Sequence, residues 1–387
     1  MLTNTALIFI FIYVAFFLFY SKKRFSSILV QILILIFCFI HIVLIVSGIT
    51  EPFHYADSTY FYQGGKYLAS HESGFNTIVK DLISYTHEVK YYGFFVLNYI
   101  FIYGSKSDIS ASISIAVCQS VIFLVFILWF AKNITDKLWI LLILSFSFLF
   151  FITQNYRDGI VSIILVLTFY SLHKRSFILL GLSTILLVYF RYEFVYIIYL
   201  SLFACFVISK FKYSNHLLLL VLCGISLLIP LLVHHQRMDF FNIIKLPLAF
   251  IGKPIPQVIA EKIADISYYQ NYFMSYLGFI LSTFSMMVMS IFMLDYFLSK
   301  SMTVKYWNIV VLNTLMMSYF ISMFLYTFIN DGFSLRVKLT FLPCLFLLLS
   351  LTSANISIKK VLGRKKTILI YVSLYFFVLI VNIRWAF

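Results

Sequence analysis

The chain consists largely of apolar runs separated by short polar segments along its whole length. Hydrophobic residues occupy 63% of its 387 positions and charged residues only 11%, which is more apolar surface than a water-soluble domain of this length buries. A helix needs roughly 20 apolar residues to cross a bilayer. The sequence therefore predicts an all-α polytopic membrane bundle with about 12 transmembrane helices, folded as one integral membrane domain over residues 1–387.

The predicted spans leave two longer polar segments, residues 49–110 and 234–272, on the same side of the membrane. Positive residues in the short loops assign the opposite side to the cytoplasm, so both segments and both termini face outward. The spans are residues 5–20, 28–47, 111–131, 138–152, 160–172, 177–190, 194–208, 217–233, 273–294, 307–328, 337–351 and 367–381.

The net charge of +15 follows this topology. The cytoplasmic loops hold 16 of the 29 basic residues but only two acids, Asp136 and Asp295. Such a distribution is the usual cytoplasmic bias of a membrane protein, so nucleic acid is not an expected partner. The five cysteines all lie within apolar runs, without the spacing of a metal site or a disulfide framework. No nucleotide-binding motif is present.

An additional apolar run, residues 91–104, lies within the first outer segment. As a helix it would reach only ~21 Å, too short for a hydrocarbon core of roughly 30 Å. We therefore expect a helix in the outer interface, anchored by tyrosines. Its tyrosines are Tyr91, Tyr92, Tyr99 and Tyr103.

The stretch from Gln154 to Tyr196 carries the most informative charges. Two predicted spans flank a basic turn at residues 173–176, so the pairs Arg157/Asp158 and Arg191/Glu193 meet at the outer surface. Ionisable groups at that depth are expensive and indicate a functional site. The alternative is that the acids and arginines pair with one another and anchor the helix ends.

Other outer residues add to this candidate site. Asp57 is placed to act as a general base, although the motif by itself favours a helix cap, because Ser58 and Thr59 follow it. Glu88 precedes the interface helix and suits its N-terminal dipole. Arg237 and Arg336 lie at other outer helix ends. Arginines that converge could grip a diphosphate in a bidentate manner and stabilise it as a leaving group. His234, His235 and Asp239 lack a third metal ligand at a recognisable spacing, so no metal site is predicted.

The pattern resembles the Wzy-type oligosaccharide repeat-unit polymerases, including their EpsG-like branch, within the GT-C class of membrane glycosyltransferases. The resemblance rests on Asp57 and Tyr60, on Glu88 before a short helix, on residues 155–159 (NYRDG) opening a helix, on Arg191, and on Arg336 entering a late helix. Arg191 stands where EpsG-like chains usually have histidine. The resemblance implies a multi-pass protein of the bacterial inner membrane with its active site facing the periplasm.

The implied reaction is the polymerisation of undecaprenyl-diphosphate-linked oligosaccharides such as O-antigen repeat units, without a cofactor or metal. Asp57, Asp158 or Glu193 would activate the acceptor hydroxyl. Arg157, Arg191 and Arg336 would hold the departing diphosphate, and Tyr60 would stack on a sugar. The implied partners are the lipid-linked oligosaccharides, the bilayer and a chain-length regulator protein. Alternatives are a GT-C transferase that adds one sugar from a polyprenyl phosphate, a lipid-linked oligosaccharide transporter and a structural membrane subunit.

Overall fold

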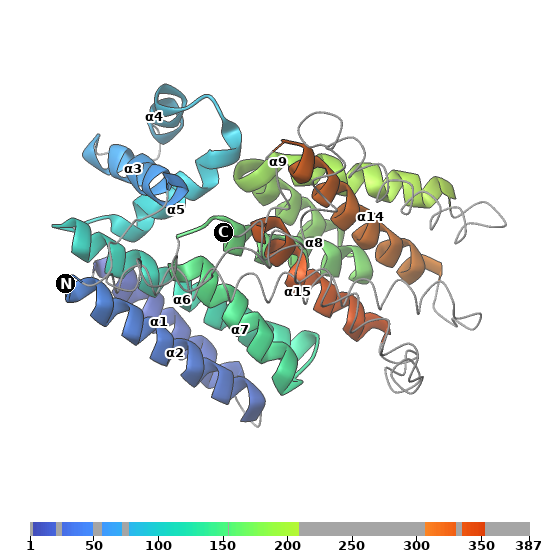
Figure 1. Ribbon diagram of the computed structural model, residues 1–387, viewed down its shortest axis with the longest axis horizontal. Helices are drawn as coiled ribbons and strands as arrows, with labels where there is room; N and C mark the ends of the chain where they lie inside the picture. Colours follow the sequence, from blue (N-terminus) through green and yellow to red (C-terminus); the bar gives the residue numbers. More distant parts are fainter. Residues whose placement is uncertain are drawn as a thin grey trace, which may run out of the picture. The chain divides into compact units, whose positions relative to one another are not determined.

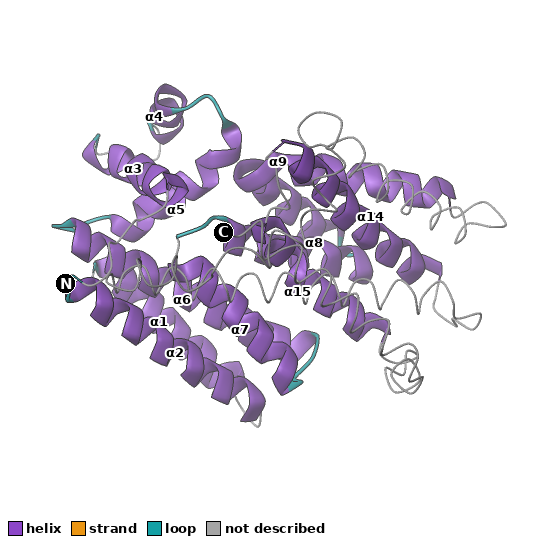
Figure 2. Ribbon diagram, in the orientation of Figure 1, coloured by secondary structure: helices purple, strands orange, loops and turns teal. Residues whose placement is uncertain are grey.

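The structure is a computed structural model of the 387-residue chain. It describes residues 3–20, 25–48, 56–71, 77–153, 155–208, 306–329 and 335–352. These residues form helices joined by turns, and no strand occurs among them (Figures 1 and 2). The predicted all-α class is confirmed for this part of the chain.

The helices fall into an early series and a late pair in the sequence (Figure 1). The early series is α1 (Asn4–Tyr20), α2 (Phe25–Val46), α3 (Ala56–Ser70), α4 (Ile78–Tyr85), the 3-10 helix η1 (Val89–Tyr91), α5 (Tyr92–Ile102), α6 (Asp108–Asn133), α7 (Leu138–Thr153), α8 (Asp158–Lys174) and α9 (Phe177–Ile208). The late pair is α14 (Tyr306–Ile329) and α15 (Leu335–Thr352).

The chain divides into two compact units. The described part of the first unit comprises residues up to 164 together with residues 182–192, so it holds α1 to α7 and parts of α8 and α9. Within it, α6 is the central element and packs against α1, α2, α5 and α7. Gln31 of α2 fixes this contact, because its Nε2 donates to the Leu124 carbonyl 3.2 Å away and its Oε1 accepts from Tyr13 of α1 at 3.1 Å.

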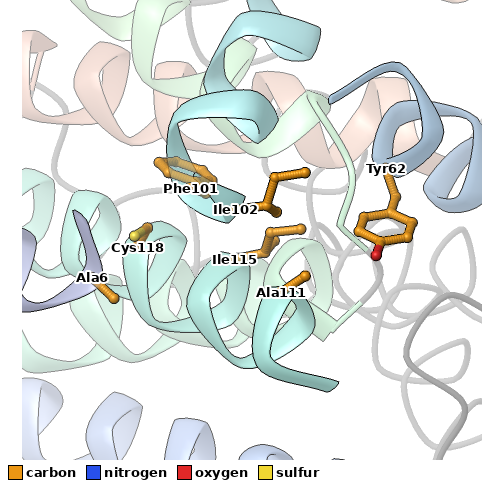
Figure 3. Packing of buried hydrophobic residues seen from close by; sticks show 7 residues of the cluster. All are labelled: Ala6, Tyr62, Phe101, Ile102, Ala111, Ile115 and Cys118. Carbon is orange, nitrogen blue, oxygen red and sulfur yellow. The ribbon is translucent and has the colours of Figure 1, made fainter. Parts of the chain in front are cut away.

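A buried apolar cluster joins four helices of the first unit. Ile102 of α5 and Ile115 of α6 lie against each other in Figure 3, and Phe101 contributes a fully buried ring. The other members are Ala6 of α1, Tyr62 of α3, and Ala111 and Cys118 of α6. The cluster holds α3 and α5 against α1 and α6.

The sequence around residue 105 explains where α5 stops and α6 starts. Gly104 has a φ of +77°, a left-handed conformation that glycine adopts without steric cost. Ser107 then caps α6, since its Oγ accepts from the Ser110 amide at 3.2 Å. Asp108 in the first turn and Lys132 in the last turn complement the helix dipole.

The second unit contains residues 165–181 and 193–208 as well as α14 and α15. Its α14 and α15 pack together, and Tyr319 meets Phe341 edge-to-face with ring centroids 5.8 Å apart. The ring of Phe194 in α9 also meets Phe341 edge-to-face, with ring centroids 5.4 Å apart. Pro343 lies inside α15, a position that neighbouring helices make tolerable in membrane proteins.

Three helices of the described chain are long and apolar enough to cross a membrane: residues Phe25–Val46, Asp108–Asn133 and Phe177–Val207. Exposed side chains such as Phe11, Phe19 and Phe39 give α1 and α2 the apolar outer faces of lipid-exposed helices. These helices indicate a membrane protein. The count of about 12 stays a prediction, because the spans at 217–233, 273–294 and 367–381 lie outside the described residues.

Two predicted spans, 177–190 and 194–208, fall within the single element α9. The backbone of α9 leaves the helical conformation at Arg191, with φ −168° and ψ 76°. The break thus lies between the two predicted spans, at the residue where the sequence places an outer surface.

The helix predicted at 91–104 is observed as η1 and α5, and its location in a membrane interface stays a prediction. It packs against α3, α6 and α1, so protein buries much of its apolar surface. Tyr92, expected as an interface anchor, is buried and donates to the Thr86 carbonyl at 3.0 Å.

Candidate functional site

Arg157 lies directly before α8, where the chain turns out of α7. Its side chain is only 8% exposed. Its Nη1 donates to the Lys90 carbonyl at 2.9 Å and to the Phe190 carbonyl at 3.3 Å. The guanidinium also lies over the Tyr91 ring, 4.5 Å from its centroid. Arg157 therefore connects η1, α8 and α9 within the first unit.

Asp158 and Arg191 form a buried ion pair beside Arg157. Arg191 Nη1 donates to Asp158 Oδ1, and the two side chains are 6% and 2% exposed. Removing one partner of such a pair strands the other charge in a low-dielectric interior. The alternative sequence interpretation, in which arginine and acid pair at the helix ends, is confirmed for these two residues. Pairing does not end a binding role, because Arg157 gives the three side chains a net positive charge.

The break in α9 serves this cluster directly. Helical backbone would direct the Phe190 carbonyl toward the amide four residues later. At Arg191 the backbone is extended instead, so this carbonyl can accept from Arg157. The same break is the point from which Arg191 reaches Asp158.

An aromatic cluster from α3, α4, η1 and α5 adjoins Arg157. Phe61 lies under the guanidinium with its ring centroid 5.6 Å away. Tyr60 is 37% exposed. Its ring centroid lies 5.4 Å from that of Tyr91 and 5.2 Å from that of Phe95. Tyr85 completes the cluster. Aromatic faces next to a cation suit ligands that combine apolar ring faces with an anion.

Glu88, which is exposed, and Lys90, which is half-buried, add an ion pair at the edge of the cluster. Lys90 Nζ lies 2.7 Å from Glu88 Oε2. The hydrogen bond from Lys90 is the main cause that lowers the pKa of Glu88, and the positive charges of Lys90 and Arg157 act in the same direction. Glu88 is therefore ionised at neutral pH, and its carboxylate interacts electrostatically with Arg157.

A chain of buried amides runs under the cluster and was not anticipated from the sequence. Gln119 Nε2 donates to Asn155 Oδ1 at 2.7 Å. Asn155 Nδ2 donates to Asn98 Oδ1 at 3.2 Å, and Asn98 Nδ2 donates to the Phe94 carbonyl at 2.9 Å. Asn155 has a φ of 46°, a left-handed conformation that asparagine tolerates better than most residues. In the sequence, Asn98 and Gln119 could be recognised only as single polar residues within apolar runs.

Close backbone packing fixes α3, which carries Tyr60 and Phe61, on α5. A Cβ at Gly64 would overlap the Phe95 ring, and one at Gly65 would lie 2.8 Å from Asn98 Cβ. Tyr62 of α3 donates to Asp108 at the start of α6. Burial and this hydrogen bond raise the pKa of Tyr62, so the phenol stays a donor.

The other residues predicted for the site are not part of the cluster around Arg157. Asp57 is in the first turn of α3, and its side chain lies outside the described residues. Arg336 opens α15 in the second unit, and its side chain too lies outside the described residues. Arg237 lies outside them entirely. Glu193 is a half-buried residue of α9 and belongs to the second unit.

No group of three potential metal ligands occurs in the part of the chain that the structure describes. The cluster offers guanidinium, amide and aromatic groups, which suit an organic anion. Comparison with protein-family models, curated proteins and solved structures finds no match.

Proposed function

We propose that the chain is a membrane glycosyltransferase that polymerises lipid-diphosphate-linked oligosaccharides at the outer face of a bacterial inner membrane. The carrying observation is the group Arg157, Asp158 and Arg191, buried at a helix start and bordered by aromatic rings. The carrier is undecaprenyl diphosphate, and the polymer is an O-antigen or a similar surface glycan. Arg157 and Arg191 are the proposed diphosphate contacts within the first unit.

Electrostatics support an anionic ligand. The two arginines exceed the one buried acid by one positive charge. The amides of the first turn of α8, which starts at Asp158, add the positive end of the helix dipole. Guanidinium groups bind phosphate through two parallel hydrogen bonds and stay charged in any protein environment. A departing diphosphate is the ligand class that these groups stabilise best.

The aromatic cluster supports a sugar close to this anion. Tyr60 presents a partly exposed ring beside Tyr91, and Tyr91 in turn lies on Arg157. A sugar stacked on Tyr60 would have its diphosphate end directed toward Arg157. The carboxylate of Asp158 already accepts from Arg191, so Asp57 of α3 is the proposed base for the acceptor hydroxyl, and Glu193 is the second candidate.

The arginines have a clear expected phenotype. Arg157→Ala should abolish the ladder of glycan repeats made by protein in proteoliposomes with undecaprenyl-diphosphate-linked oligosaccharide, because a diphosphate contact is lost. Arg157→Lys should restore little, since an ammonium group cannot form the bidentate contact. The product is resolved by gel electrophoresis. Arg175→Ala, at an exposed arginine of the basic turn, is the control and should keep the ladder.

Product length separates the candidate functions. A polymerase gives a ladder, a transferase using a polyprenyl phosphate donor gives one added sugar, and a transporter moves its lipid without forming a bond. A full ladder from Arg157→Ala would contradict the diphosphate role and favour a structural membrane subunit.

Asp57→Asn separates a base from a residue that only supports the first turn of α3. Asparagine keeps a polar side chain of the same size there but cannot accept a proton. We therefore expect the variant to keep the thermal stability of the wild type and to lose polymer formation. Unchanged polymer formation would restrict Asp57 to supporting the start of α3 and would exclude it as the base.

A further inference from the structure

The three amide side chains below the arginine cluster form one continuous relay. Asn98 and Gln119 are fully buried, and Asn155 is 3% exposed. They come from α5, from α6 and from the turn before α8, so the relay crosses three separate segments of the first unit. Its three hydrogen bonds span 2.7 to 3.2 Å.

The direction of every hydrogen bond in the relay is fixed by its last acceptor. The Phe94 carbonyl can only accept, so the amide nitrogen of Asn98 must face it. Asn98 then presents its oxygen to Asn155, and Asn155 presents its oxygen to Gln119. Gln119 must therefore act as a donor. A reversed amide at any member would place two oxygens or two NH₂ groups against each other.

The middle member of the relay, Asn155, lies in the segment that carries the cluster. Asn155 precedes Arg157 by two residues and is held in a left-handed conformation. On the other side, Asn98 contacts Gly65 of α3, the helix that carries Tyr60 and Phe61. The relay thus fixes the turn of Arg157 and Asp158 with respect to α5 and α6. Apolar side chains could fill the same volume, but they would not impose one arrangement on the turn.

We infer that Asn98 and Gln119 are positioning residues that hold Arg157 and Asp158 in place for the anionic ligand. The inference rests on the proposed function for the identity of that ligand. Neither amide contacts the ligand. Each acts through Asn155, and the loss of either leaves a buried amide group of Asn155 unsatisfied and its turn free to shift.

The binding test uses undecaprenyl diphosphate as the probe, with protein in nanodiscs and affinity read by native mass spectrometry. Gln119→Leu and Asn98→Leu should each weaken affinity by about tenfold, as expected for one lost buried hydrogen bond. Gln31→Leu is the matched control. It removes an equally buried glutamine whose two hydrogen bonds involve no member of the relay, and it should lower thermal stability without changing affinity.

The donor role of Gln119 gives a second, pH-dependent test. In Gln119→Glu, the introduced carboxyl can donate to Asn155 only while it is neutral, and binding then resembles the wild type. Once it ionises with rising pH, the carboxylate faces the Asn155 oxygen and binding falls. We expect a loss of affinity with rising pH that the wild type does not show, a change that a general packing role would not produce.

The outcomes separate the inference from the function. If Gln119→Leu binds as tightly as Gln31→Leu while Arg157→Ala does not bind, the positioning role is overturned and the proposed function stands. If the wild type does not bind the probe, the proposed function fails. The positioning role is then decided by a double-mutant cycle on unfolding with Gln119→Leu and Arg157→Lys: coupled effects support it, and additive effects overturn it.

Discussion

Arg191→Leu should be among the most damaging single substitutions in this chain. It leaves the carboxylate of Asp158, 2% exposed, without its arginine. Breaking a buried ion pair by removing one partner typically costs about 3–5 kcal/mol. We expect a loss of that size in the free energy of unfolding, measured in bicelles, together with complete loss of polymer.

The double variant Arg191→Leu with Asp158→Leu separates the two losses. Removing both charges leaves no stranded ion, and apolar replacements of buried pairs are often neutral or stabilising. Stability should therefore return toward the wild type. Polymer formation should not return, because the proposed diphosphate contact of Arg191 is still absent. Recovery of the glycan ladder in the double variant would show that the pair is an anchor for the helix ends and nothing more.

Hydropathy and helix length were enough to predict the class of fold. The apolar runs at 28–47, 111–131 and 138–152 became α2, α6 and α7 with shifts of a few residues, since a run of that length can bury its backbone in lipid only as a helix. Length also set 91–104 apart from the spans, and its helix is short in the structure. What covers α5 was not predictable, because the contact partners α3 and α6 are determined by packing and not by apolar periodicity.

For the candidate site, the sequence identified the charges but not their geometry. Arg157, Asp158 and Arg191 were singled out because charged residues interrupt apolar runs, and the structure places them together. The pairing of Arg191 with Asp158 depends on the break in α9 at Arg191. No proline or glycine in the sequence marks this break. Gln119 and Asn98 were missed for a related reason. One amide in an apolar helix is compatible with many partners, and the distance to Asn155 decides among them.

Gly65→Ala should separate α3 from the rest of the cluster. The added Cβ would lie 2.8 Å from Asn98 Cβ and 2.9 Å from the Tyr99 backbone nitrogen. Backbone cannot rotate away as the end of a side chain can, so α3 must shift on α5. Overpacking of this kind costs about 1–3 kcal/mol. We expect a lower unfolding free energy, and reduced polymer formation as α3 carries Tyr60 and Asp57 away from Arg157.

Gly181→Ala is the matched control, because a Cβ at this helical position of α9 meets nothing within 4 Å. Alanine favours a helix over glycine by about 1 kcal/mol, so this variant should be as stable as the wild type or more stable. The contrast tests packing and not propensity, since Gly65 is also helical and the same propensity gain applies there. If Gly65→Ala were stabilised like Gly181→Ala, α3 could move on α5 without cost, and the relay through Asn98 would not link α3 to Arg157.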